Sequence, residues 1–154
     1  EITCRDWSSD VCSSDLQIAN WVIIYSPLQM AADLIENYEG HPAFRFFRDF
    51  DADCDWSKAL QGEIGDYIVV ARRAKDRYFL GAGTDEKART LVQKLDFLDP
   101  GVTYTATIYA DAPDAGRNPE AYLIGKRAVT ARDTIRIEMA ERGGQAITFI
   151  PAEK

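Results

Sequence analysis

Histidine, cysteine, long apolar runs and excess positive charge are all scarce in this sequence, and each scarcity excludes a class of function. His41 is the only histidine, which excludes a metal site built from several histidines. Its place in "GHPAF" favours a role at a helix N-terminus over acid–base chemistry in a Ser-His-Asp triad. No apolar run approaches the roughly 20 residues that a membrane span requires. The net charge of −7 gives no basic surface of the kind that binds nucleic acid.

The first sixteen residues, "EITCRDWSSDVCSSDL", differ from the rest of the chain. They repeat Ser-Ser-Asp, show neither helical nor strand periodicity, and include Cys4 and Cys12. Read back into codons, Asp6–Leu16 match a common sequencing-library adapter in one reading frame. We therefore interpret residues 1–16 as a non-native, disordered segment, with a native Ser/Asp-rich linker as the alternative, and exclude them from fold reasoning. Only Cys54 then remains, so neither a disulfide framework nor a thiolate metal site is expected.

Residues 17–50 predict a strand followed by helix. The continuous apolar run "NWVIIYS" (20–26) is typical of a strand buried on both faces. In "PLQMAADLIENYEG" (27–40) apolar residues recur at helical spacing, and "HPAFRFFRDF" (41–50) places Pro42 at a plausible first helical position. A strand followed by helix is the repeat unit of an α/β barrel or a doubly wound sheet.

After Asp51 the sequence changes to short runs rich in Val, Ile, Thr, Tyr and Phe. Seven such runs are separated by turn residues such as "AKD", "DPG" and "RGG": 66–74, 77–83, 89–98, 103–112, 121–129, 133–141 and 144–151. In "LDPGVTY" the Pro100–Gly101 pair predicts a tight turn. The pattern predicts an antiparallel β-sandwich or barrel over residues 60–154, joined to residues 17–50 by an acidic linker at 51–59.

The residue patterns that resemble catalytic or metal sites are incomplete. "DADCDW" begins like a calcium-binding EF-hand loop, but Trp56 and Gly62 occupy the positions that require Gly and Glu. Glu63 and Asp66 lie in one short turn, whereas glycosidase carboxylates face each other several ångströms apart. A platform for stacking sugars is a further alternative, although packing is the favoured role for the aromatic residues concerned: Trp56, Tyr67, Tyr78 and Tyr109.

Several stretches together resemble the C-terminal end of glycoside hydrolase family 97, whose members are bacterial α-glucosidases and α-galactosidases. The resemblance covers nearly all of residues 17–150, in order, through these stretches: "SPLQMAADLIENYEGHPAFRFFRDF", "DWSKALQGEIGDYIVVARRAKD", "FLDPGVTYTATIYADAPDA", "NPEAYLIGKRAVT" and "GGQAITF". It implies an N-terminal β-sandwich, a central (β/α)8 barrel with the active site, and a C-terminal antiparallel β-domain. Residues 17–50 are then expected to be the eighth barrel strand and its helix, and 60–154 the C-terminal domain.

The same resemblance implies an activity that lies mostly outside this chain. Family members cleave α-linked glucosides or galactosides with a carboxylate pair assisted by calcium, and those groups are expected upstream, so no catalytic residue or metal ligand is assigned here. Ser26, Gln29 and Asp33 follow the expected barrel strand and are candidate sugar contacts at the barrel rim. The expected partners are the upstream barrel and N-terminal domain, an oligo- or disaccharide substrate and a second copy of the chain, and the expected location is periplasmic or secreted.

Two rival interpretations remain open: a stand-alone carbohydrate-binding module and a structural β-sandwich without a ligand. Gln17–Phe50 discriminates between these and a truncated glycosidase, because a self-sufficient module has no reason to begin with a barrel unit whose neighbours are missing.

Overall fold

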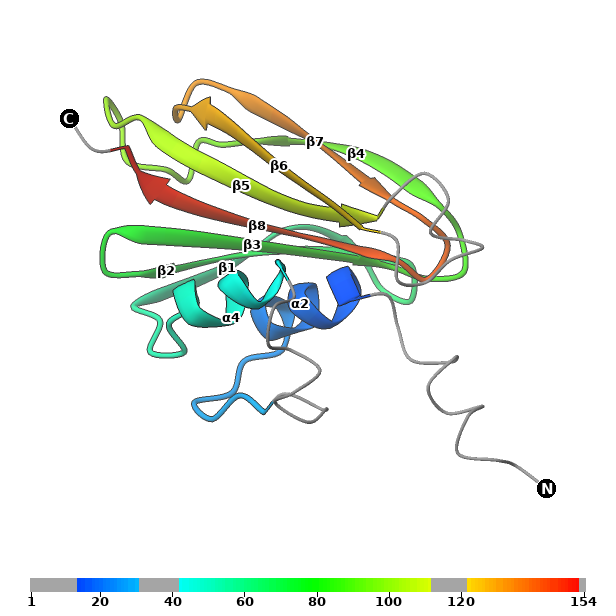
Figure 1. Cartoon of the computed structure of the whole chain (residues 1–154). Helices are drawn as coiled ribbons and strands as arrows, with labels where there is room; N and C mark the ends of the chain where they lie inside the picture. Colours follow the sequence, from blue (N-terminus) through cyan, green and yellow to red (C-terminus); the bar gives the residue numbers. More distant parts are fainter. Residues whose placement is uncertain (1–13, 31–41, 112–121, 153–154) are drawn as a thin grey trace.

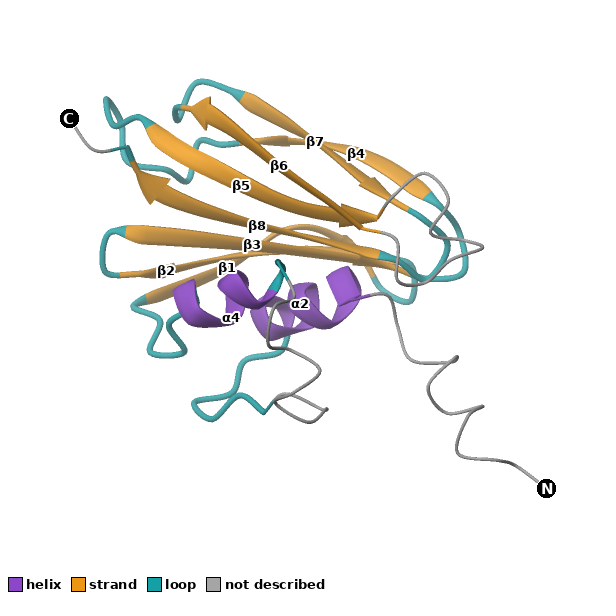
Figure 2. Ribbon diagram, in the orientation of Figure 1, coloured by secondary structure: helices purple, strands orange, loops and turns teal. Residues whose placement is uncertain are grey.

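The computed structural model describes residues 14–30, 42–111 and 122–152, which form three layers: two helices, a six-stranded antiparallel sheet and a two-stranded sheet (Figures 1 and 2). The helices are α2 (Ser14–Ile23) and α4 (Phe44–Asp49). The strands are β1 (Trp56–Glu63), β2 (Tyr67–Ala74), β3 (Arg77–Thr84), β4 (Arg89–Lys94), β5 (Tyr104–Asp111), β6 (Tyr122–Val129), β7 (Thr134–Met139) and β8 (Gly144–Pro151). In these ranges, neither helix has the length and apolar character needed to traverse a lipid bilayer.

The large sheet has the strand order β1-β2-β3-β8-β5-β6, and β4 pairs with β7 in the small sheet. Every pairing is antiparallel. Because β1 and β6 remain edges, the sheet is open, and the fold is a mainly β sandwich rather than a closed barrel. The helices cover the outer face of the large sheet, opposite the β4–β7 layer (Figure 2).

All seven predicted β runs contain a strand, and the strand ends lie within two residues of the predicted ends, except that the third run (89–98) is a strand only as far as Lys94. The alternation in β7 is confirmed, since Ile135, Ile137 and Met139 are buried between exposed neighbours. β1 was missed and assigned in part to the linker. As an edge strand it has mostly exposed side chains and a bulge between Ala59 and Gln61, so its sequence lacks apolar alternation.

Pro100 and Gly101 form the predicted tight turn between the small and large sheets. The backbone N–H of Val102 donates to the carbonyl of Asp99 at 3.4 Å, and Gly101 has φ +79°. Pro100 holds the φ that the first central position needs, and glycine accepts the left-handed φ of the second without strain. The turn brings the chain into β5.

The predicted strand at 20–26 is wrong, because residues up to Ile23 form helix α2. Ile18, Ala19 and Val22 are buried at helical spacing against the sheet, whereas Ile24 and Tyr25 beyond the helix are exposed. A short apolar run fits a buried strand or one buried helix face equally well, and periodicity alone does not separate them. Residues 17–50 therefore do not supply the expected order of strand and then helix.

Two further expectations on the same region change. Residues 14–16, which we expected to be disordered, are the first residues of α2, and residues 1–13 lie outside the described ranges. The helix expected over 27–40 falls mostly on residues 31–41, also outside them, and its described part, 27–30, is not helical. The helix expected after Pro42 is confirmed as α4, with Phe46 buried.

The large sheet has a buried core on each face. Between the two sheets lies the inter-sheet core, which includes Leu80, Tyr104, Ile137, Ile147 and Phe149. Between the large sheet and the helices lies the helix-side core, which includes Ile18, Val22, Phe46, Phe79 and Tyr109. Since side chains alternate along a strand, β3 and β5 contribute to both cores, which explains why their sequences are apolar on both faces.

Candidate functional site

Two of the three predicted sugar-contact residues lie in the described segment that follows α2. The Ser26 hydroxyl donates to the carbonyl of Leu28 at 2.6 Å and accepts from the backbone N–H of Leu28 at 3.3 Å. The Gln29 amide Nε2 donates to the carbonyls of Trp21 and Ile24, both at 3.2 Å. Asp33 lies outside the described residues. Both described side chains therefore make local backbone contacts that shape the exit from α2.

Arg72 of β2 reaches the same helix end from the sheet. Its Nε donates to the carbonyl of Val22, and its Nη2 donates to the carbonyl of Ile23 at 3.2 Å. The guanidinium also lies 5.1 Å from the centroid of the Tyr25 ring. Arg72 is 5% exposed, which is unusual for an arginine. The sequence analysis did not single out Arg72. The signal that could have identified it is a basic residue on the same face of the strand as the buried Val70 and Ala74.

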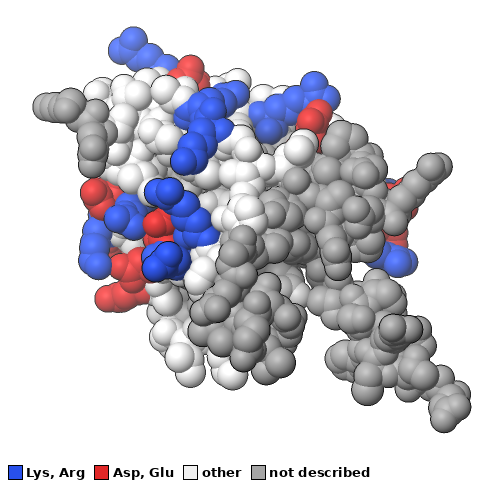
Figure 3. Space-filling view, in the orientation of Figure 1, with Lys and Arg blue, Asp and Glu red and all other residues white. Residues whose placement is uncertain are grey.

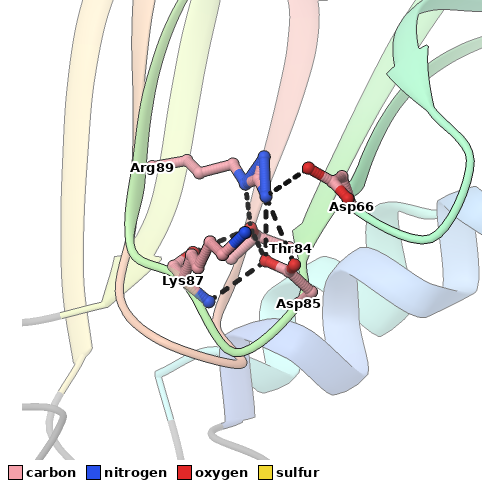
Figure 4. A network of polar contacts seen from close by, with 5 residues as sticks. All are labelled: Asp66, Thr84, Asp85, Lys87 and Arg89. Atoms are coloured by element: carbon pink, nitrogen blue, oxygen red, sulfur yellow. Dashed lines mark hydrogen bonds and ion pairs between the residues drawn. The ribbon is translucent and has the colours of Figure 1, made fainter.

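A second polar cluster ties the β1–β2 turn to the β3–β4 turn (Figure 4). The Arg89 Nη2 atom lies 2.8 Å from a carboxylate oxygen of Asp66 and 3.1 Å from one of Asp85, and its Nε donates to the Thr84 hydroxyl at 3.0 Å. Burial raises the pKa of Asp85, but the hydrogen bond from the Lys87 N–H and the nearby Arg89 and Lys87 charges outweigh it, so the pKa is lowered overall. Both carboxylates are bound as structural anions.

A groove of about 660 Å³ lies between the β1–β2 hairpin and one side of α2, from Leu16 to Ile23. Its wall is mainly apolar and includes Leu16, Ile23, Leu60, Ile64, Tyr67 and Ile68. Asp66 and Asp85 at its rim are ion-paired with Arg89. The groove therefore offers an apolar surface rather than a pair of carboxylates free for acid–base work, and Asp66 is not available as the partner of Glu63.

Asp99 joins two buried tyrosines at the edge of the inter-sheet core. The hydroxyls of Tyr78 and Tyr104 each donate to its carboxylate at 3.0 Å. Burial and this hydrogen bond raise the pKa of both tyrosines. Tyr109, on the opposite face, is also buried, and burial together with the nearby Asp49 charge raises its pKa to about 12.

The aromatic residues considered as a sugar platform are dispersed. Tyr78 and Tyr109 are buried in different cores, as the packing interpretation predicted, while Trp56 and Tyr67 are half-buried on β1 and β2. The Tyr67 ring lies under the Arg89 guanidinium, 5.2 Å from centroid to carbon. A common flat surface for stacking a sugar is not formed by these four rings.

The acidic stretch at 51–55 makes structural contacts. The carboxylate of Asp51 accepts from the N–H of Asp53 at 3.1 Å and pairs with the Lys75 ammonium at 2.8 Å, while that of Asp55 accepts from the Lys75 N–H at 2.7 Å. Within residues 14–30, 42–111 and 122–152 there is no group of three or more His, Cys, Asp or Glu side chains placed to hold a metal ion. Burial raises the pKa of the Cys54 thiol, which disfavours its thiolate.

Charge on the molecular surface is mixed. On the face shown in Figure 3, Lys and Arg side chains lie beside Asp and Glu at several places.

The domain family follows from comparison with known proteins. The family model described as "Glycosyl-hydrolase 97 C-terminal, oligomerisation" matches residues 53–150. The chain belongs to this family. The match begins just before β1 and ends in β8, so it covers both β-sheets, and it confirms the resemblance drawn from the sequence stretches.

The relatives are glycoside hydrolases. A retaining alpha-galactosidase of Bacteroides thetaiotaomicron is 31% identical over 132 residues, covering 85% of this chain and 20% of that protein. A glycoside hydrolase family 97 enzyme from Pseudoalteromonas sp. strain K8, solved in complex with acarbose, is 43% identical with a TM-score of 0.88, covering 92% of this chain and 23% of that one. A beta-arabinopyranosidase structure at 21% identity and TM-score 0.67 shares the fold. The chain thus spans about a fifth of the length of the relatives it matches.

Proposed function

We propose that this chain is the C-terminal part of an α-glycoside hydrolase of the α-glucosidase or α-galactosidase type, and that its β-domain supports the catalytic barrel. The chain itself is expected to be inactive, because the groove offers no free pair of carboxylates: Asp66 and Asp85 are both ion-paired with Arg89. The catalytic acid, its partner carboxylate and the calcium ligands are expected in the upstream part of the enzyme. No step of the reaction is assigned to residues of this chain.

One observation supports the proposal that this domain packs against the barrel: large apolar side chains are exposed directly after helix α2. Ile24, Tyr25, Leu28 and Met30 are 62%, 59%, 74% and 78% exposed. Four large apolar side chains within seven residues form a surface that soluble proteins normally cover with a partner or with another part of the chain. The relatives, whose length is several times that of this chain, favour the remainder of the same protein as the cover.

Finer features extend the same proposal. The domain family is described as an oligomerisation domain, so we expect a second copy of the enzyme to be a partner. We also propose Ser26, Gln29 and Asp33 as sugar contacts at the barrel rim, although they follow helix α2 rather than the expected barrel strand. A periplasmic or secreted location is expected for an enzyme of this class.

The decisive experiment is to recover the gene upstream of this segment and assay the longer protein. We expect it to hydrolyse p-nitrophenyl α-galactoside or α-glucoside and to leave the β-anomers intact, while the 154-residue chain hydrolyses none of them. Hydrolysis by the 154-residue chain would overturn the claim that the catalytic carboxylates lie elsewhere. A longer protein without activity on any α-glycoside would overturn the assignment to an α-glycosidase.

A stand-alone sugar-binding module is the alternative, and no observation on the described residues favours it. Its candidate aromatic residues are dispersed, and two of them are buried in separate cores.

A further inference from the structure

The carbonyl groups at the C-terminal end of α2 need hydrogen-bond donors from outside the helix. The last four carbonyls at a helix end lack partners within the helix and need other donors. The N–H of Ile24 closes on the carbonyl of Asn20 at 2.8 Å, which leaves the next four carbonyls, those of residues 21–24, without a helical partner. The helix is followed by an irregular segment, so ordinary helical bonds cannot supply donors there.

Two side chains from outside the helix donate to all four of these carbonyls. Gln29 donates to the carbonyls of Trp21 and Ile24, and Arg72 donates to those of Val22 and Ile23. Gln29 belongs to the segment that leaves the helix, whereas Arg72 belongs to β2 of the large sheet. The helix end, the outgoing segment and the sheet are therefore joined at one point.

The electrostatics of this point are unusual. Arg72 is 5% exposed, yet among the ion pairs of the described residues none involves it. A buried cation needs compensation, and the C-terminus of a helix provides about half an elementary negative charge together with free carbonyls. The guanidinium suits this role because its donors are arranged in a rigid fork. The face of Tyr25 adds a cation–π contact to the same group.

We propose that Arg72 and Gln29 form a joint cap that fixes the course of residues 24–30 relative to the β-domain, and that Arg72 is a positioning residue for the sugar site to which this segment leads. The second half of the inference rests on the proposed function. Gln29 then acts through its amide donors on the helix end, since both contacts of Nε2 are with backbone carbonyls. The β-domain thereby contributes to substrate binding without touching the sugar.

The cap is tested first in the 154-residue chain by amide hydrogen exchange. We expect Arg72→Met and Gln29→Glu each to raise exchange of the α2 amides at least tenfold relative to those of β5. Methionine removes the donors, and a glutamate places a negative charge against the negative helix end. Arg72→Lys should give an intermediate effect, because an ammonium lacks the planar fork. Unchanged α2 exchange in both Arg72→Met and Gln29→Glu overturns the cap.

Arg73→Met is the matched control. Arg73 is the next residue of the same strand, lies on the opposite face and has 40% of its side chain exposed. Its substitution by methionine removes the same charge as Arg72→Met does. We expect it to leave α2 exchange unchanged, and an increase equal to that of Arg72→Met would overturn a specific role for Arg72. Gln29→Glu lies in the segment after α2, outside both cores, so the test stands even if Arg72→Met does not fold.

Positioning is tested in the longer enzyme by separating KM from kcat. We expect Arg72→Met to raise KM for the α-glycoside about tenfold with a smaller change in kcat, Arg72→Lys to restore part of the loss, and Arg73→Met to change neither. Faster α2 exchange with an unchanged KM overturns the positioning role. An enzyme without α-glycosidase activity overturns the proposed function instead, and the exchange data still decide the cap.

Discussion

The core between the two sheets is closed by strands and by the connection that follows β4, whereas the core on the other face of the large sheet is closed mainly by helices. The inter-sheet core is built mainly from aliphatic residues such as Leu80, Ile137 and Ile147. The helix-side core contains a cluster of rings, in which Phe46 stacks on Phe50 with centroids 5.7 Å apart and meets Tyr109 edge-on at 5.5 Å.

The two cores also differ at their borders. The helix-side core continues into the exposed apolar segment that follows α2, including Leu28 and Met30. The inter-sheet core is enclosed by residues of the matched family domain. One face of the sheet thus packs within the matched family domain, and the other packs against the helices that precede it.

Truncating one large ring in each core gives the largest effect and tests this division directly. Phe46 and Phe149 are both fully buried, and Phe→Ala at such sites costs about 3–5 kcal/mol. We expect Phe149→Ala to lower the free energy of global unfolding, measured by urea denaturation. Phe46→Ala should mainly release the helices, seen as faster hydrogen exchange in α2 and α4.

The distinction fails if Phe46→Ala increases exchange in the small sheet as much as in the helices. It also fails if Phe149→Ala spares the strands and loosens only the helices.

A smaller effect is expected from adding one methyl group under α2. A Cβ on Gly81 would lie 2.6 Å from the carbonyl oxygen of Ala19 and 2.8 Å from Cβ of Val22, so Gly81→Ala must push the helix away from the sheet. Overpacking of this kind costs about 1–3 kcal/mol. Gly125→Ala on β6 is the control, since a Cβ there meets nothing within 4 Å. Thermal unfolding should separate the two variants, and equal melting temperatures would contradict the close contact of α2 with β3.

The smallest effect concerns alkaline pH. The folded state raises the pKa of Tyr109 from 10.0 to about 12, so the unfolded chain loses this proton first as pH rises. The stability that the protonated group contributes is complete below pH 10 and decreases between pH 10 and 12. We expect Tyr109→Phe to reduce this loss while leaving stability at pH 7 nearly unchanged. Urea midpoints at pH 7 and pH 11 measure it, and an identical pH dependence in both proteins would contradict the assignment.

Much of the β-domain could be predicted because its signals are local. Alternation in β7 and the turn at Pro100–Gly101 depend on neighbouring residues, and both are as expected. α2 was misread because burial on one face is a tertiary property, set by the sheet against which Ile18 and Val22 pack. β1 was missed because an edge strand needs little apolar alternation.

The candidate site could be predicted only in part. Ser26 and Gln29 are placed together after α2, but their partners are backbone carbonyls and N–H groups that no side-chain pattern reveals. Arg72 lies 43 positions after Gln29 along the chain, and only the pairing of the strands brings it to the same helix end.

The position of β8 has a consequence for synthesis of the protein. Of the described strands β8 is made last, yet it lies between β3 and β5, where Leu80 and Ile108 both pair with Ile147. Until β8 leaves the ribosome, the β1–β2–β3 part and the β5–β6 part of the large sheet are not joined. The unpaired edges of β3 and β5 are then able to pair with strands of other proteins. A nascent chain that stalls before Gly144 is therefore a candidate for chaperone binding. The large sheet forms completely only after β8 has been synthesised and has paired with both β3 and β5.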